Sequence, residues 1–152
     1  MSRTSSREYP LRPILSVGAI IRKGGKILIV KRGVEPGKGK WSVPGGAVEL
    51  GETVEDAVVR EAFEESNLKV TPLRLVGYYD YIGVDSSSEI RFHYVIIYWL
   101  CDYSRGEARP SSDVTETRWI GFEELDNYDV TKGTLKMIRK VEKEMSGVEH
   151  ED

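Results

Sequence analysis

Two pairs of apolar runs, each interrupted by a polar turn, dominate the hydrophobic pattern of the chain. Residues 14–22 and 26–32 are rich in isoleucine and valine and flank the turn sequence KGGK, so they predict a hairpin with a glycine-bearing turn. Residues 68–82 and 89–103 are longer extended runs joined by the polar sequence GVDSSS, and they predict a second hairpin. The chain is therefore expected to contain a sheet built largely from two antiparallel pairs.

Two other segments carry the signals of helices. The first follows Thr53, a suitable N-cap, has acidic residues in its first turn and runs to Ser66. Asn67 then suits the left-handed conformation that ends a helix. The second helix is expected at residues 131–145, where apolar side chains recur at helical spacing: Leu135, Ile138, Val141 and Met145.

The remaining segments predict loops and short elements. Residues 33–40 contain a proline and three glycines and are expected to form a loop, whereas residues 41–49 read as extended chain broken at its Pro-Gly-Gly sequence. The sequence TRWIGF predicts a short strand, and FEELDNY a helical turn after it. Strands with one embedded and one terminal helix predict an α+β fold, a sandwich with a mixed sheet between helices.

Length and composition indicate one globular domain. The chain of 152 residues is long enough for a single core, which we place at residues 13–146, between a flexible polar arm at 1–12 and a disordered acidic tail at 147–152. A net charge of −3 gives no basic field, so specific nucleic-acid binding is not expected. No apolar run approaches the roughly 18 residues that span a bilayer, and the N-terminus lacks the apolar core of a secretory signal. The expected location is the cytoplasm, without a membrane partner.

The first helix concentrates acid on its buried side. An advance of about 100° per residue places Glu61, Glu64 and Glu65 in line with the apolar stripe of the preceding turns. Like charges three and four residues apart repel, and one neighbouring cation, Arg60, cannot balance three acids. A hard divalent cation such as Mg²⁺ or Mn²⁺ would neutralise them, since it prefers carboxylate oxygen. The helix alone leaves open a second interpretation, a solvated acidic face.

A longer pattern surrounds this helix. It reads G46-x5-E52-x7-R60-E61-A62-x-E64-E65-x-N67-L68, and it resembles the Nudix box of the Nudix (MutT-like) pyrophosphohydrolases, Gly-x5-Glu-x7-Arg-Glu-U-x-Glu-Glu-x-Gly-U with U apolar. Eight of the nine constrained positions agree. The exception is Asn67 in place of glycine, and asparagine is the next residue most able to adopt a positive φ. Similar lead-in and late segments, WSVPGG and WIGFEEL, extend the resemblance over roughly residues 14–145.

The resemblance implies an α/β/α sandwich and hydrolysis of a nucleoside diphosphate linked to another group, with Mg²⁺ or Mn²⁺ as cofactor and a small-molecule nucleotide as partner. By position it implies metal ligands at the Gly45 carbonyl, Glu61, Glu64 and Glu65. Catalytic roles fall on Glu64 and Glu61, with Arg60 orienting a glutamate, and supporting roles around the ligands fall on Glu52 and Gly46. Which glutamate acts as general base is left open, because some family members recruit an acid from a later loop.

Five residues outside the box are candidate substrate contacts. Arg32 and Arg91 are suited to phosphate oxygens, although either is equally compatible with a surface charge. Tyr79 is placed to stack on a base, with cross-strand aromatic packing as the alternative. Asp113 and Glu116 precede the strand that contains Trp119 and are the candidate later-loop acids, with ordinary loop solvation as the alternative.

The sequence favours one substrate class without fixing it. The run YPLRPILSVGAII resembles Nudix members assigned to ADP-ribose, although residues 82–85 lack the proline common in that group. A nucleoside triphosphate pyrophosphohydrolase that releases pyrophosphate is the second hypothesis. A nucleotide-sensing domain without turnover is the third, but such domains typically lose box acids, and all four are present. Dimerisation is common in the family, so a homodimer is also compatible with the resemblance.

Overall fold

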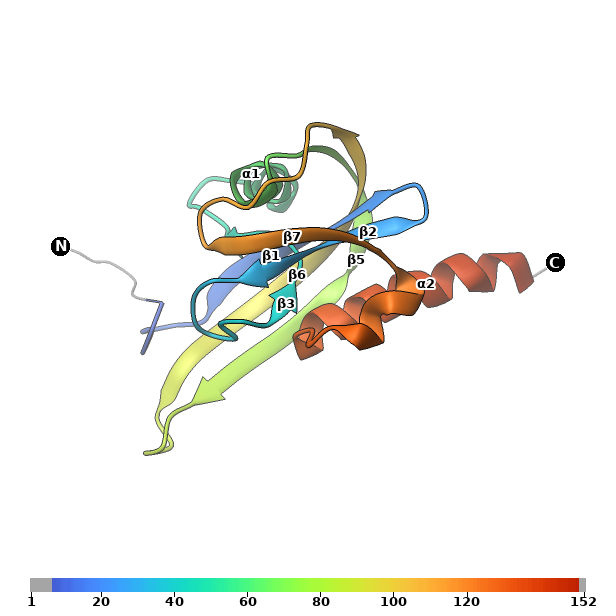
Figure 1. Ribbon diagram of the computed structural model, residues 1–152. Coiled ribbons are helices and arrows are strands. Elements are labelled where there is room, and N and C mark those ends of the chain that lie inside the picture. Colours follow the sequence, from blue (N-terminus) through green and yellow to red (C-terminus); the bar gives the residue numbers. More distant parts are fainter. Residues whose placement is uncertain (1–6, 151–152) are drawn as a thin grey trace.

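The computed structural model describes residues 7–150 of the chain (Figure 1). The beginning of the predicted arm, residues 1–6, and the end of the predicted tail, residues 151–152, lie outside the described residues. Neither α-helix in the described part combines the length and the apolar character that crossing a bilayer requires.

Both predicted hairpins are present. Strands β1 (Ile14–Lys23) and β2 (Lys26–Arg32) pair antiparallel, and Gly24 in their turn has a φ of 61°, which glycine adopts without strain. Strands β5 (Lys69–Val84) and β6 (Ile90–Arg105) form the second pair along their length. Figure 1 shows the turn end of this pair extending beyond the rest of the sheet.

The strands form one seven-stranded mixed sheet with the central order β3-β2-β1-β6-β5. Strands β1 and β6 run parallel, whereas the other pairs are antiparallel. The short strands β3 (Trp41–Ser42) and β4 (Gly45–Ala47) come from the segment predicted as broken extended chain, and β4 pairs with β1. Strand β7 (Val114–Gly121) pairs with β2 and begins three residues before the predicted sequence TRWIGF. A short 3-10 helix, η1 (Phe122–Asn127), follows it as expected.

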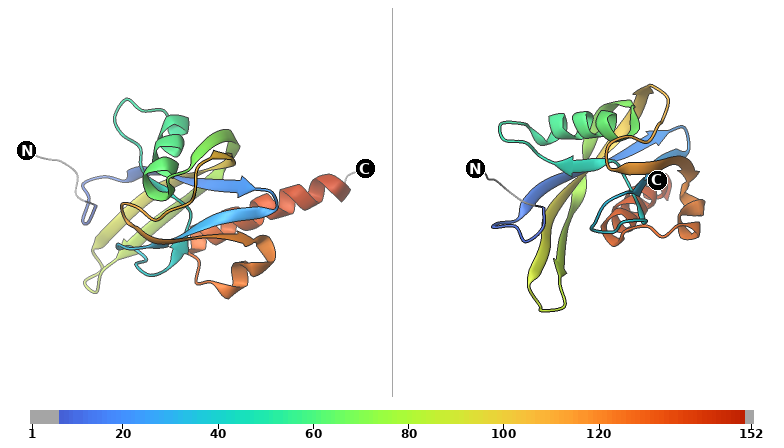
Figure 2. Two further views of the ribbon diagram at one scale, coloured as in Figure 1. Left: turned by 45° about the horizontal axis from the view of Figure 1, so that its top comes forward. Right: turned by 60° about the vertical axis from the view of Figure 1, so that its left-hand side comes forward.

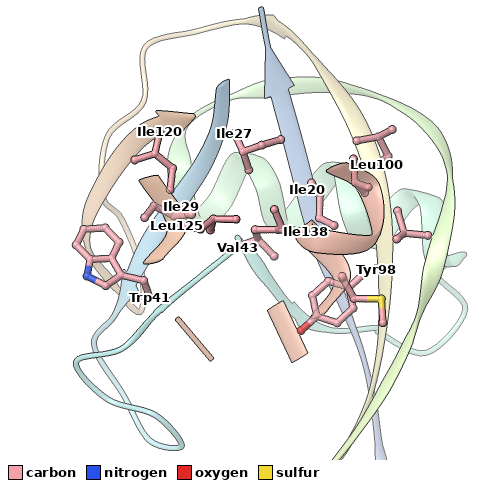
Figure 3. Close-up of a cluster of buried hydrophobic side chains, with 13 residues drawn as sticks. Ile20, Ile27, Ile29, Trp41, Val43, Tyr98, Leu100, Ile120, Leu125 and Ile138 are labelled. Carbon is pink, nitrogen blue, oxygen red and sulfur yellow. The ribbon is translucent and has the colours of Figure 1, made fainter. Parts of the chain in front are cut away.

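One helix covers each face of the sheet (Figures 1 and 2). Helix α1 (Val54–Ser66) packs on one face and helix α2 (Lys132–His150) on the other. The alternation along β1 divides the core between them, since Val17, Ala19 and Ile21 join the cluster under α1 and Ile20 joins the cluster under α2 (Figure 3). The predicted α+β class and the three-layer sandwich are confirmed.

The ends of the domain differ from the sequence-based prediction. Helix α2 continues to His150, so the tail predicted as disordered is helical over residues 147–150. The sequence of this segment, GVEH, contains no proline, and a single glycine near a helix end weakens a helix without stopping it. Residues 7–9 of the predicted arm are hydrogen-bonded to the body of the domain.

Candidate active site

Local sequence signals fix both ends of α1. The Thr53 hydroxyl accepts a hydrogen bond from the Asp56 N–H at 3.1 Å, so the predicted N-cap is confirmed. Asn67 ends the helix with a φ of 67°, the left-handed conformation expected of it. Its side-chain amide also donates to the Glu107 carbonyl at 3.0 Å, a contact that a glycine cannot make. The one departure from the box pattern therefore preserves the end of the helix.

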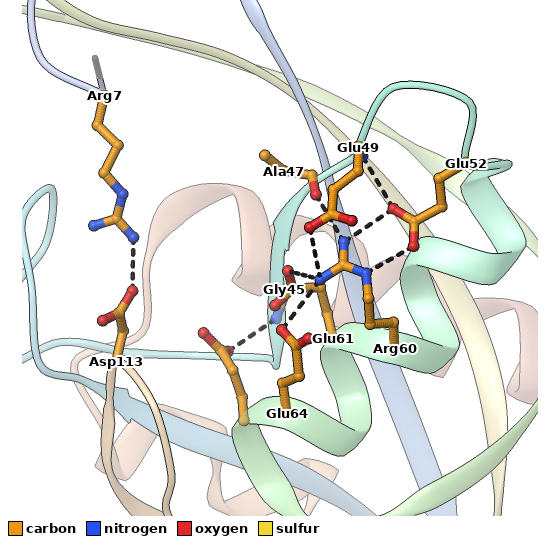
Figure 4. A network of polar contacts seen from close by, with 10 residues as sticks. Arg7, Gly45, Ala47, Glu49, Glu52, Arg60, Glu61, Glu64 and Asp113 are labelled. Atoms are coloured by element: carbon orange, nitrogen blue, oxygen red, sulfur yellow. Dashed lines mark hydrogen bonds and ion pairs between the residues drawn. The ribbon is translucent and has the colours of Figure 1, made fainter. Parts of the chain in front are cut away.

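Arg60 is the centre of a hydrogen-bond network that spans the box (Figure 4). It binds Glu52 with two nitrogens, at 2.7 Å and 2.9 Å, and it also donates to Glu61 at 2.8 Å and to Glu64 at 3.1 Å. The Arg60 hydrogen bonds and the Glu49 N–H lower the pKa of the Glu52 carboxyl to about 2. Glu52 thus holds the arginine, and the arginine orients two of the box carboxylates.

Two glycines let the chain pass close to α1. Strand β4 runs between β1 and the Glu61 carboxylate, with Gly46 opposite Val17 and Gly45 opposite Gly18. A Cβ atom on Gly46 would lie 2.5 Å from Glu61 Cδ, and one on Gly45 would collide with the Val17 carbonyl oxygen. A side chain at position 45 would meet backbone, and one at position 46 would displace the Glu61 carboxylate, so both positions favour glycine.

The carboxylates at the end of the apolar stripe are poorly solvated. Glu61 is 9% exposed, and burial raises its pKa against the opposing effect of Arg60. Burial also raises the pKa of Glu65 to about 7, although the Gly45 N–H donates to it at 3.0 Å. The side chain of Glu64 is 50% exposed. The predicted continuation of the stripe is therefore present for Glu61 and Glu65, and Glu64 lies at its solvent edge.

These carboxylates suit a hard cation, although they do not yet surround one point. Among residues 7–150, no three acidic, histidine or cysteine side chains are arranged as a ready set of metal ligands. Glu61 and Glu64 accept hydrogen bonds from Arg60, whereas Glu65 accepts one from the Gly45 N–H. The donors are all carboxylate oxygens, which Mg²⁺ and Mn²⁺ prefer. Glu64 is half exposed and is held by one hydrogen bond of 3.1 Å, so it is the least restrained of the three carboxylates.

Two of the predicted substrate contacts, Arg32 and Asp113, carry charges that act on Glu65. The charge of Arg32 lowers the pKa of Glu65, and the charge of Asp113 raises it. The backbone joins the two segments, because the Gly33 N–H donates to the Asp113 carbonyl at 2.7 Å. Arg32 also donates from Nε to the Pro36 carbonyl at 2.7 Å, which holds the loop after β2. A hollow of about 550 Å³ opens next to Glu64, between the exposed ring of Phe63 and the loop at residues 109–112.

The structure does not bring the other three predicted contacts to the carboxylates. Tyr79 packs into the cluster under α2, on the opposite face of the sheet from α1. Glu116 accepts hydrogen bonds from Lys31 and Arg118, each at 3.4 Å. The guanidinium of Arg118 lies over the Trp41 ring of the same α2-face cluster. Arg91 donates to Glu8 at 2.7 Å near the turn end of the long hairpin.

Three residues that contact the site, Ala47, Glu49 and Arg7, were not predicted from the sequence. The Ala47 carbonyl accepts a hydrogen bond from Arg60 at 3.0 Å, and the Glu49 carboxylate lies 3.9 Å from the Arg60 guanidinium. Both residues fall in the unconstrained stretch of the motif, where only the acidic character of Glu49 close to Glu52 could have pointed to the network. Arg7 forms an ion pair with Asp113 at 2.7 Å (Figure 4). A contact across 106 residues leaves no local pattern.

Comparisons with known proteins agree with this geometry. A family model described as the NUDIX domain matches residues 12–141. A protein of Methanocaldococcus jannaschii named ADP-ribose pyrophosphatase is 38% identical over 115 residues, which are 76% of this chain and 66% of that protein's length. A MutT-like protein of Streptomyces ambofaciens is 32% identical over 116 residues, 76% of this chain and 68% of the relative. The crystal structure of a MutT NUDIX hydrolase from Burkholderia pseudomallei matches with a TM-score of 0.74 and 30% identity, over 86% of this chain and 98% of the other.

Proposed function

The chain belongs to the Nudix family, and we propose that it hydrolyses a phosphoanhydride bond in a nucleoside diphosphate linked to another group, with ADP-ribose as the first candidate substrate. The observation that carries the proposal is the pair of poorly solvated carboxylates, Glu61 and Glu65, against the glycines of β4. Carboxylates whose charged forms are disfavoured by burial are typical of sites that hold a cation or move a proton.

Mg²⁺ or Mn²⁺ is the proposed cofactor, held by Glu61, Glu64, Glu65 and the Gly45 carbonyl, and it would supply charge neutralisation at the phosphates and a positioned water. The protein's own residues set the geometry. Glu52 fixes Arg60 through two hydrogen bonds, and Arg60 in turn limits the positions of Glu61 and Glu64. Arg32, whose positive charge acts on Glu65, is the proposed partner of a phosphate oxygen.

Glu64 is the proposed acceptor of the proton from the attacking water. Its carboxylate is half exposed and borders the open hollow, so water reaches it, whereas Glu61 and Glu65 are largely enclosed. The two later-loop acids are less well placed. Asp113 is engaged by Arg7, and Glu116 contacts the face of the sheet that lies away from α1.

Similarity supports the choice of substrate. The relative with 38% identity is named for ADP-ribose, and we propose the same substrate here on that ground together with the chemistry of the site. Hydrolysis of a nucleoside triphosphate with release of pyrophosphate is the second candidate, supported by the MutT-like relative. We retain two further predictions from the sequence, a cytoplasmic location and a homodimer.

The test is turnover of a substrate panel with Mg²⁺ or Mn²⁺. The panel comprises ADP-ribose, sugar nucleotides, dinucleoside polyphosphates and the common (d)NTPs, with products separated by chromatography. We expect AMP and ribose 5-phosphate from ADP-ribose, and a much lower rate for the Glu64→Gln variant. Release of pyrophosphate from triphosphates alone would favour the second candidate. A protein that turns over no member of the panel would be a sensing domain, and the hydrolase proposal would be wrong.

A further inference from the structure

The N-terminal segment at residues 7–9 is fastened to the body of the domain by side-chain and backbone hydrogen bonds. Residues 7–9 contact three parts of the chain that are far apart in sequence, namely the segment before β7, the start of β6 and the turn between β5 and β6. The contacts are Arg7 to Asp113 at 2.7 Å, Arg91 to Glu8 at 2.7 Å, the Tyr9 hydroxyl to Asp85 at 2.8 Å and the Tyr9 N–H to the Arg91 carbonyl at 2.7 Å. The segment is thus held at both its side chains and its backbone.

This segment encloses a recess of about 380 Å³. Its three walls are the segment itself, the loop after β2 and the start of β6. The lining residues are Arg7, Glu8, Val34, Glu35, Arg91 and Phe92. The Pro36 carbonyl accepts a hydrogen bond from Arg32 Nε at 2.7 Å, which fastens the loop wall to the end of β2.

The lining favours hydroxyl groups over a nucleobase or a further phosphate. Four of the six lining residues are charged, two guanidiniums and two carboxylates, so the recess has both strong donors and strong acceptors and no net formal charge. A polyanion is attracted by the guanidiniums but repelled by the carboxylates, so it gains little net binding energy. A hydroxyl group can donate to a carboxylate and accept from a guanidinium. Phe92 is 4% exposed, and the guanidinium carbon of Arg91 lies 4.9 Å from its ring centroid. No aromatic face of the lining is therefore free to stack on a base.

The Arg7 and Asp113 pair connects the recess to the side of the domain that carries the α1 carboxylates. Arg7 in its wall pairs with Asp113 at 2.7 Å, and the Asp113 carbonyl accepts from the Gly33 N–H, one residue from the loop wall, also at 2.7 Å. Figure 4 shows the Arg7 and Asp113 pair in the same close-up view as Glu64 and the Arg60 network. A group attached to a diphosphate at the carboxylates would extend into this recess.

We propose that the recess binds the sugar on the far side of the diphosphate, with Arg7 and Arg91 as the residues that set this preference. The inference rests on the proposed function and narrows it. A nucleoside diphosphate sugar, ADP-ribose among them, places several hydroxyl groups between the paired guanidiniums and carboxylates. A nucleoside triphosphate has no group to place there, so the recess selects against it.

The test compares two substrates that differ only in this group, ADP-ribose and the methyl ester of ADP, with Mg²⁺. Arg7→Ala is expected to raise KM for ADP-ribose about tenfold, the effect of one lost charge-assisted hydrogen bond, with kcat within about twofold. KM for the methyl ester should not change. Arg7→Lys should restore part of the loss. The matched control is Arg74→Ala, which removes an exposed arginine from an ion pair of the same 2.7 Å length, with Glu144, and should change neither KM.

The results that contradict the sugar site differ from those that contradict the proposed function. An equal change of KM for both substrates, or no change for either, overturns the sugar site while leaving the hydrolase proposal intact. Failure of wild type to turn over either compound contradicts the proposed function instead, and the same comparison is then made by calorimetry, where ADP-ribose must bind more tightly than the methyl ester. Equal dissociation constants would contradict the sugar site. The melting temperature of Arg7→Ala should stay within about 2 °C of wild type, because exposed pairs add little to stability.

Discussion

The two ends of the acidic motif hold the same residue type in opposite electrostatic states. At one end, Glu52 accepts two hydrogen bonds from Arg60 and one from the Glu49 N–H, and its pKa falls to about 2. At the other end, Glu65 accepts one hydrogen bond from the Gly45 N–H, and burial raises its pKa to about 7. The first carboxylate has a fixed partner within the protein, and the second has a charge that the protein leaves largely uncompensated.

The difference follows from the reach of one guanidinium. Arg60 places two nitrogens on Glu52, and its remaining bonds go to Glu61, Glu64 and the Ala47 carbonyl. Glu65 lies one turn beyond Glu61, and among the described contacts it makes no hydrogen bond to Arg60. The motif thus combines a structural end, where charge is already neutralised, with a proposed reactive end, where a cation would be stabilised. Four changes test this division.

Removal of the uncompensated charge should have the largest effect. Glu65→Gln keeps the shape and the acceptor for the Gly45 N–H, but we expect turnover to fall at least ~100-fold, as is typical when an electrostatic catalytic group is lost. Without metal, the variant should melt no lower than wild type, because a desolvated charge has been removed. Steady-state kinetics and thermal melts measure both. The control is Glu107→Gln, which changes an exposed glutamate and should keep turnover within tenfold of wild type. If Glu65→Gln also stays within tenfold, Glu65 is not part of the reactive end.

Removal of the fixed partner should act on stability as well as on turnover. Arg60→Ala leaves Glu52 and Glu61 without their guanidinium, and we expect a loss of about 2 kcal/mol in the free energy of unfolding, below the full cost of breaking a buried pair because the site is partly solvated. Urea denaturation measures it. The surface pair Arg74 and Glu144 provides the comparison, with an expected loss below about 1 kcal/mol for Arg74→Ala. Equal losses would mean that the network adds nothing beyond a surface ion pair.

Mg²⁺ should stabilise the reactive end alone. A ligand that binds only the native state, present at ten times its dissociation constant, adds about 1.4 kcal/mol to the free energy of unfolding. We expect the melting temperature of wild type to rise with Mg²⁺, and the rise to be largely lost in Glu65→Gln. Glu52→Gln should keep it, since Glu52 faces Arg60. The same rise in all three proteins would place the ion elsewhere.

Acid should affect the structural end last. The pKa of Glu52 is lowered in the folded protein, from its ordinary 4.5 to about 2, so its contribution to stability is complete above about pH 4.5 and is lost as the pH falls towards 2. The difference in melting temperature between wild type and Glu52→Gln should therefore be constant near neutral pH and shrink towards pH 3. The difference between wild type and Glu107→Gln serves as the control. A Glu52 difference that persists unchanged at pH 3 would contradict the depressed pKa.

Local signals in the sequence predicted most of the framework. Both hairpins, the bounds of α1 and its two caps follow from periodicity, turn residues and capping chemistry, which act between residues a few positions apart. Helical spacing predicted the box carboxylates on one helix, and the structure has them there, with the glycines of β4 against Glu61 and Glu65. Helix α2 is longer than predicted because its apolar periodicity weakens before the helix ends.

The placement of distant residues was decided by tertiary structure. Strand periodicity predicts which residues share a face, but it does not say which helix covers that face. The sequence therefore could not show that Tyr79 lies on the face covered by α2, away from the carboxylates of α1. Glu116 and Val114 are two positions apart, yet Val114 packs under α1 while Glu116 joins Arg118 on the other side. The register of β2 and β7 shifts between Lys31 and Arg32, and such a bulge reverses the alternation that the sequence implies.

The sequence by itself determined the fold class, the acidic helix and the family, because these depend on short-range spacing. Only the tertiary structure divided the glutamates into a neutralised and an uncompensated set, since that division depends on burial and on the reach of Arg60. It alone also brought Arg7 to Asp113 across 106 residues and so formed the recess next to the site. Charge and spacing are local properties of a chain, whereas desolvation and long-range pairing arise only when distant segments pack together.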